Sequence, residues 1–173
     1  MSDRSNSPPT VNEVRVAAMD LLARREHARG ELQTKLQRRF ADAELVAGVL
    51  DDLAAENLQS DARYAESLLR QRLDRGYGPL RIQQEMRERG VDPVRVAAAL
   101  EAVAPNWREA AEQVYARKFD PVPESPAEPL DNPVSWQARR AEQQQRLKEK
   151  ARRMRFMQYR GFLPEHFRHL LED

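Results

Sequence analysis

The sequence contains no cysteine and few aromatic residues, which make up 6% of the chain. The absence of cysteine excludes disulfide bonds, thiolate catalysis and metal sites with cysteine ligands. No uninterrupted apolar run approaches the ~20 residues that a transmembrane helix needs, and the N-terminus lacks the apolar segment of a signal peptide. We therefore expect a cytoplasmic protein with no membrane contact.

Groups that usually carry catalysis are also scarce. The chain has three histidines, of which His166 and His169 lie three residues apart beside Glu165. A short terminal helix without further ligands predicts surface histidines here rather than a metal site. The glycines at 76–78 are not a phosphate-binding loop, because neither a preceding strand nor the required lysine is present. The sequence thus predicts a protein that is not an enzyme and uses no cofactor.

Charge is abundant and unevenly distributed. Charged residues make up 33% of the chain, yet the net charge is only +1. Residues 136–160 hold nine Lys/Arg against two Glu, whereas residues 41–66 hold seven acids against one arginine. Such asymmetry is typical of a surface that steers toward a charged partner, although a solvated charged face on long helices explains each run equally well.

Apolar residues recur at helical spacing throughout, and no strand-like alternation is present. Thr10 and Glu13 form a capping box, Asp42 precedes another apolar stripe, and Asp92-Pro93 can cap and open a helix. Gly90 is placed where a left-handed residue ends a helix. We expect an all-α fold with helices near residues 10–25, 31–40, 42–53, 61–73, 79–89, 93–104, 106–115, 133–160 and 164–171.

The helices repeat with a period of about 50 residues. A shift of 50 places the apolar residues of 32–53 onto those of 82–103, and residues 160–164 repeat residues 89–93 at a shift of 71. An internal repeat of this kind indicates a tandem array of small helical units. We expect a disordered leader and three three-helix repeats, the third interrupted by a Pro-rich linker and a long basic helix: 1–9, 10–58, 59–104 and 105–173, with the linker at 120–133.

Basic residues recur at corresponding places of the three repeats, which suits a partner that is a helical polyanion or an acidic groove. Tyr64 and Phe162 are predicted core residues, whereas Tyr77 is either a turn residue folded back on its own unit or a partner contact. The predicted partner-binding residues are Arg24, Arg25, Arg29, Lys35, Arg38 and Arg39; Arg70, Arg72, Arg75, Arg81, Arg87 and Arg89; and Lys148, Lys150, Arg152, Arg153 and Arg155.

Short motifs in all three repeats, over roughly residues 12–171, give the chain a family resemblance. These motifs are Glu31-Leu32, Lys35-Leu36 and Phe40; Asp61, Tyr64-Ala65, Gly76-Tyr77-Gly78, Glu85-Met86 and Arg89-Gly90-Val91; and Lys118-Phe119, 150–152, 154–157 and Arg160-Gly161-Phe162. With them the chain resembles the RecX family of bacterial proteins, which regulate the RecA recombinase. Residues 120–149 depart from the family pattern by being longer than its usual connection.

The resemblance implies an elongated, curved, solenoid-like body that lies in the groove of the RecA–DNA filament. It implies inhibition of ATP hydrolysis, strand exchange and coprotease activity, with the RecA filament as partner, weaker contact with single- and double-stranded DNA, and a monomeric chain. The rival hypotheses are a general helical-repeat nucleic-acid-binding protein that acts by phosphate neutralisation, and a structural scaffold. The motif residues expected to be mainly structural are Glu31, Leu32, Asp61, Tyr64, Gly76, Gly78, Gly90, Arg160, Gly161 and Phe162.

Overall fold

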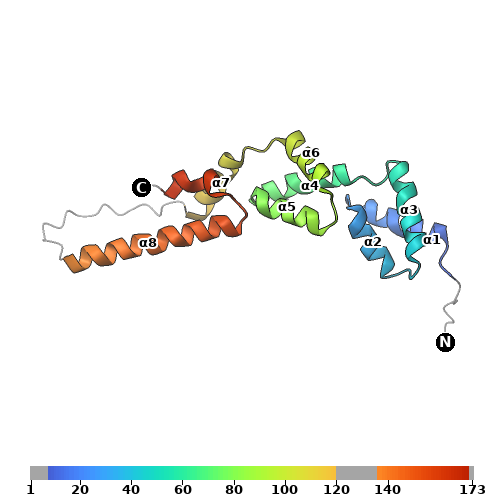
Figure 1. The fold of residues 1–173 in the computed structure, drawn as a ribbon, viewed down its shortest axis with the longest axis horizontal. Coiled ribbons are helices and arrows are strands. Elements are labelled where there is room, and N and C mark those ends of the chain that lie inside the picture. Colours follow the sequence, from blue (N-terminus) through green and yellow to red (C-terminus); the bar gives the residue numbers. More distant parts are fainter. Residues whose placement is uncertain (1–7, 120–135, 172–173) are drawn as a thin grey trace, which may run out of the picture. The chain divides into compact units, whose positions relative to one another are not determined.

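The computed structural model describes residues 8–119 and 136–171, and within these ranges every regular element is a helix (Figure 1). This confirms the predicted all-α fold. The predicted linker at 120–133 and most of the predicted leader lie outside the described residues. The helices are α1 (Val11–Leu22), α2 (Arg29–Gln37), α3 (Ala43–Ala55), α4 (Asp61–Asp74), α5 (Pro79–Glu88), α6 (Pro93–Val103), α7 (Trp107–Phe119), α8 (Trp136–Tyr159) and α9 (Pro164–Phe167), followed by a 3₁₀ turn at Arg168–Leu171.

The chain forms two compact units. Unit 1 comprises residues 1–71 and 83–104, and unit 2 comprises residues 72–82 and 105–173. The boundary passes through α4 and α5, so the units do not coincide with the three expected repeats, which stay a prediction.

In unit 1, helices α1, α2 and α3 contact one another around a shared apolar core. The predicted capping box forms: the Thr10 hydroxyl accepts from the Glu13 amide, while the Glu13 carboxylate accepts from the Thr10 amide at 2.8 Å. Asp42 caps α3 by accepting from the Leu45 amide. The core consists of Val14, Ala17, Ala18, Leu32, Leu36, Phe40, Val46, Val49, Leu50 and Leu53.

The end of α5 and the start of α6 follow the sequence prediction closely. Gly90 has a φ of 81°, a left-handed conformation that glycine adopts without steric cost. Asp92 then caps α6 by accepting from the Arg95 amide, and Pro93 is the first helical residue. Tyr64 is buried at 3% exposure, as expected of a core residue.

Unit 2 has its own core, which joins α7, the C-terminal part of α8, α9 and the 3₁₀ turn. Gly161 repeats the role of Gly90 with a φ of 89°, and α9 begins at Pro164 as α6 begins at Pro93. The buried residues are Ala111, Val114, Met157, Phe162, Phe167 and Leu171. By contrast, side chains 136–148 of α8 are all exposed. Among the described helices, none combines the length and apolarity needed to span a bilayer.

Three sequence predictions need correction. Helix α1 ends at Leu22 rather than near Arg25, because the following residues turn to place Arg25 and His27 against α2. Helix α2 begins at Arg29, so Gly30 lies inside it rather than before it. His166 is not a surface residue: its side chain is 11% exposed, and it stacks on Trp107.

Candidate functional site

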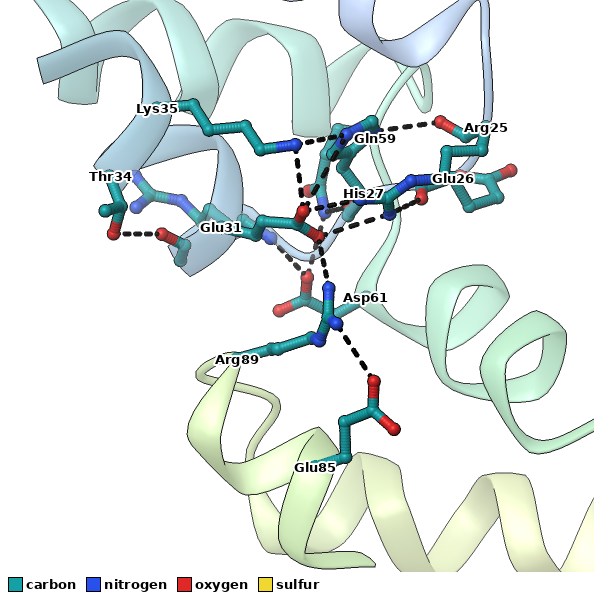
Figure 2. Close-up of polar contacts among 12 residues, drawn as sticks. Arg25, Glu26, His27, Glu31, Thr34, Lys35, Gln59, Asp61, Glu85 and Arg89 are labelled. Carbon is teal, nitrogen blue, oxygen red and sulfur yellow. Dashed lines mark hydrogen bonds and ion pairs between the residues drawn. The ribbon is translucent and has the colours of Figure 1, made fainter. Parts of the chain in front are cut away.

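A cluster of charged side chains surrounds Glu31 in unit 1 (Figure 2). The Glu31 carboxylate accepts from the Arg25 guanidinium at 2.5 Å and forms an ion pair with Lys35 Nζ at 3.0 Å. Arg89, at the end of α5, donates to the same carboxylate at 3.2 Å and to Glu85 at 2.9 Å. Glu31 thus ties together the turn before α2, α2 itself and the end of α5.

The environment of Glu31 strongly favours its ionised form. Burial by itself raises its pKa, but hydrogen bonds and charges from Arg25 and Lys35 outweigh burial and lower the pKa to about 2. His27 lies beside this carboxylate at 2% exposure, and burial lowers its pKa. A neutral His27 accepts from Lys35 Nζ, which is 3.1 Å from Nε2, and its Nδ1 lies 3.0 Å from the Arg25 carbonyl oxygen. The cluster therefore holds the carboxylates of Glu31 and Glu85, three cations and one neutral imidazole.

A carboxylate at the start of α4 caps α2. Ala28, at the N-cap position, offers no side-chain acceptor, and Asp61 instead accepts from the Arg29 amide at 2.8 Å. Gln59, which is 4% exposed, orients Asp61 by donating to its carboxylate while also contacting the His27 carbonyl. Two motif residues, Glu31 and Asp61, thus make hydrogen bonds within unit 1.

The first set of predicted basic residues divides into paired and unpaired side chains. Arg25 and Lys35 both bind Glu31, and Arg29 is paired with Asp51. Arg24 and Arg38 are exposed and have no side-chain partner within the described residues, and Arg39 lies over the Phe40 ring. The unpaired side chains are the ones available to a partner.

The second set divides in the same way. Arg70 is paired with Glu66, and Arg89 belongs to the Glu31 cluster. Arg87 in unit 1 and Arg75 in unit 2 are exposed, and no described group pairs with either side chain. Arg72 is half-buried.

In unit 2, the start of α5 meets the end of α8 through backbone atoms. The Gly78 amide donates to the Arg160 carbonyl at 2.8 Å, and the Leu80 amide donates to the Gly161 carbonyl at 3.1 Å. A Cβ on Gly78 would lie 2.4 Å from the Gly161 carbonyl oxygen, and a Cβ on Gly161 would lie 2.6 Å from the Arg81 amide nitrogen. Both glycines are therefore required by the close approach of the two helix ends.

Guanidinium groups and aromatic rings alternate beside this contact. Arg81 lies over the Tyr77 ring at 4.7 Å and the Tyr159 ring at 5.1 Å. Arg160 lies over Tyr77 at 5.2 Å and Phe156 at 5.4 Å. Tyr77 is half-buried and contacts Arg81 of its own expected repeat and Arg160 of the next, so its two interpretations stay open. Such contacts fix the arginines and leave Tyr159, at 72% exposure, facing solvent.

The third basic set also contains both paired and unpaired side chains. Glu149 binds Arg152 and Arg153, and Arg153 also donates to the Tyr115 hydroxyl at 2.8 Å. Lys148, Lys150 and Arg155 are exposed, without side-chain partners among the described residues.

Sequence reasoning did not assign two cations to a basic surface: Arg117 was not singled out, and Lys118 was named only as part of a family motif. They end α7 and line a small pocket with Arg75 and Arg160. The run Arg-Lys-Phe at 117–119 was the available signal, but it does not reveal that residue 75 lies beside it.

The histidines support no metal site. His169 binds Glu112 at 2.8 Å, and His166 accepts from the Leu163 amide at the start of α9. In the ranges that the structure describes, no three His, Asp or Glu side chains gather where they could hold a metal ion.

Comparison with known proteins gives the family. A family model described as the first three-helix domain of RecX matches residues 15–53, and one described as the second three-helix domain matches residues 60–100. The chain is 40% identical over 149 residues to regulatory protein RecX of Pseudomonas syringae pv. tomato, covering 86% of this chain and 83% of that protein. It is 40% identical over 158 residues to regulatory protein RecX of Pseudomonas entomophila, covering 91% and 89% of the two chains.

Two solved structures share the fold. A crystal structure of regulatory protein RecX matches with a TM-score of 0.71 at 19% identity, over 92% of this chain and 71% of that chain. RecX from Lactobacillus salivarius matches with a TM-score of 0.64 at 17% identity, over 93% and 94%. The family models, the curated relatives and the fold agree, and the chain therefore belongs to the RecX family of regulatory proteins.

Proposed function

We propose that this protein regulates a RecA recombinase without catalysing a reaction itself. In this proposal it binds as a cytoplasmic monomer in the groove of the RecA–DNA filament and restrains ATP hydrolysis, strand exchange and coprotease activity. The observation that carries the proposal is the 40% identity to regulatory proteins named RecX over most of the chain. A groove-bound protein that contacts neighbouring RecA subunits would act by restricting the motions that ATP turnover needs.

The unpaired cations on the described surface support a charged partner. Arg24, Arg38 and Arg87 in unit 1 are exposed and have no described side-chain partner. Long exposed cations without partners contribute little to the stability of a fold, and they accelerate association with an acidic surface. The same residues also favour the second candidate function, general nucleic-acid binding by phosphate neutralisation.

The deciding assay measures RecA ATP hydrolysis on single-stranded DNA while this protein is titrated. Inhibition at well below one molecule per RecA supports filament regulation, because a groove-bound molecule affects several subunits. No change in ATP hydrolysis at equimolar protein would refute it. Affinity separates the two candidates: if naked DNA binds as tightly as the filament, with a steep salt dependence, general nucleic-acid binding is correct.

Substitution of the unpaired cations tests their part in the interaction. The triple variant Arg24→Gln/Arg38→Gln/Arg87→Gln should need several-fold more protein for half-maximal inhibition of ATP hydrolysis, with an unchanged circular dichroism spectrum. Unchanged inhibition would show that these cations do not face the partner, as the scaffold hypothesis expects.

A matched control lowers the net charge by the same amount elsewhere in unit 1. Residues 97, 98 and 102 are exposed alanines on α6. The variant Ala97→Glu/Ala98→Glu/Ala102→Glu therefore lowers the net charge by three units and leaves the three arginines in place. If it weakens inhibition as much as the arginine variant does, net charge rather than a defined surface governs binding.

A further inference from the structure

Four cationic side chains line one small pocket in unit 2. Arg75, Arg117, Lys118 and Arg160 surround an open hollow of about 200 Å³ beside Phe156. The described lining contains no carboxylate. Arg75, Arg117 and Lys118 are exposed, and no described side chain pairs with them. Arg160 uses one nitrogen to donate to the Arg75 carbonyl at 3.0 Å.

Gathering four like charges is unfavourable unless an anion joins them, since each cation raises the potential felt by the others. Guanidinium groups present planar pairs of N–H donors that match the oxygens of a phosphate. The pocket therefore has the donors and the charge to hold one phosphate group.

An aromatic surface leads away from this pocket. Arg160, which lines the pocket, lies against the Phe156 and Tyr77 rings, and Arg81 continues the stack from Tyr77 to Tyr159. The Tyr159 ring ends the stack and is 72% exposed. Proteins that bind single-stranded nucleic acids combine a basic groove for the backbone with exposed aromatic rings on which bases stack.

We propose that the pocket and the Tyr159 ring form a binding site for single-stranded nucleic acid. The pocket takes a backbone phosphate, and the ring of Tyr159 stacks on an unpaired base. A duplex is a poor ligand because its bases are stacked on one another and cannot reach Tyr159. The site deepens the proposed function and rests on it for its biological role, since a regulator of filaments on single-stranded DNA would meet such a strand.

The phosphate contact is tested by fluorescence anisotropy with a labelled oligothymidine in the absence of RecA. The variant Arg117→Gln/Lys118→Gln should bind at least several-fold more weakly, and its plot of log affinity against log salt should flatten by about 0.7 for each phosphate that is no longer neutralised. The control Arg139→Gln/Arg140→Gln removes the same charge about 30 Å along α8 from Arg160. It should retain nearly full affinity and slope. An equal weakening in both variants overturns the site.

The stacking contact is tested with two ligands, an oligothymidine and an abasic oligonucleotide of the same length. Tyr159→Ala should weaken binding of the oligothymidine about tenfold and leave the abasic strand nearly unaffected, because only the first offers a base. Tyr159→Phe keeps the ring and should bind like the unsubstituted protein. An equal weakening on both ligands would mean that Tyr159 only supports Arg81, and would refute stacking.

Competition identifies the class of ligand. Unlabelled oligothymidine should displace the labelled strand at far lower concentration than a duplex or polyglutamate. Equal displacement by the duplex or by polyglutamate contradicts a single-strand site. Because RecA is absent, failure of these tests leaves RecA regulation standing, and failure of the ATP hydrolysis test leaves this site standing.

Discussion

Replacing Glu31 by Gln should destabilise unit 1 at neutral pH. The carboxylate is 12% exposed and holds Arg25, Lys35 and Arg89. Its pKa of about 2 in the folded protein, against 4.5 for the free side chain, corresponds to about 3 kcal/mol of stabilisation at pH 7. Its three partners are 46%, 38% and 31% exposed, so solvent screening reduces the expected destabilisation to about 2 kcal/mol.

Urea unfolding followed by circular dichroism measures this destabilisation. The difference between the two proteins should be constant above about pH 5 and should shrink as the pH falls toward 2, because protonation then removes the charge from Glu31 itself. Glu44→Gln is the control: Glu44 is exposed on α3 without a described partner, and its replacement should cost less than about 0.5 kcal/mol. A Glu31→Gln variant as stable as the control at pH 7 would refute the reasoning.

Two further predictions concern His27 and the glycines. Burial lowers the pKa of His27 below 6.5, so the unfolded chain takes up the proton first and the free energy of unfolding should fall between about pH 7 and 5. His27→Gln should reduce this pH dependence of the free energy of unfolding, measured by urea titration. A dependence as steep as in the unsubstituted protein would contradict the prediction. Gly78→Ala should cost about 2 kcal/mol or more, because its Cβ would lie 2.4 Å from the Gly161 carbonyl. Gly48 lies on α3, where an added Cβ would have nothing within 4 Å, so Gly48→Ala should stabilise the protein by about 0.5–1 kcal/mol. Equal changes in the free energy of unfolding for the two variants would show that the close approach at Gly78 is irrelevant.

Features encoded by neighbouring residues were predictable from the sequence. Helical periodicity indicated the all-α fold and the core positions, and the left-handed conformations of Gly90 and Gly161 followed from their place between two helices. Contacts between distant residues were not predictable. Glu31 and Arg89 are 58 positions apart, and no local pattern indicates that a carboxylate of α2 binds the arginine that follows α5. The pocket around Arg117 depends equally on which helix ends meet.

The two helix junctions respond differently to dissolved ions. Within unit 1, the contact between the start of α2 and the end of α5 includes the ion pair of Glu31 with Arg89, whose guanidinium is partly open to solvent. Within unit 2, the contact between the start of α5 and the end of α8 is made by amides and carbonyls of Gly78, Leu80, Arg160 and Gly161. Counterions weaken the first kind of contact and hardly affect the second. Raising the ionic strength should therefore weaken the contact between α2 and α5 while the contact between α5 and α8 keeps its geometry.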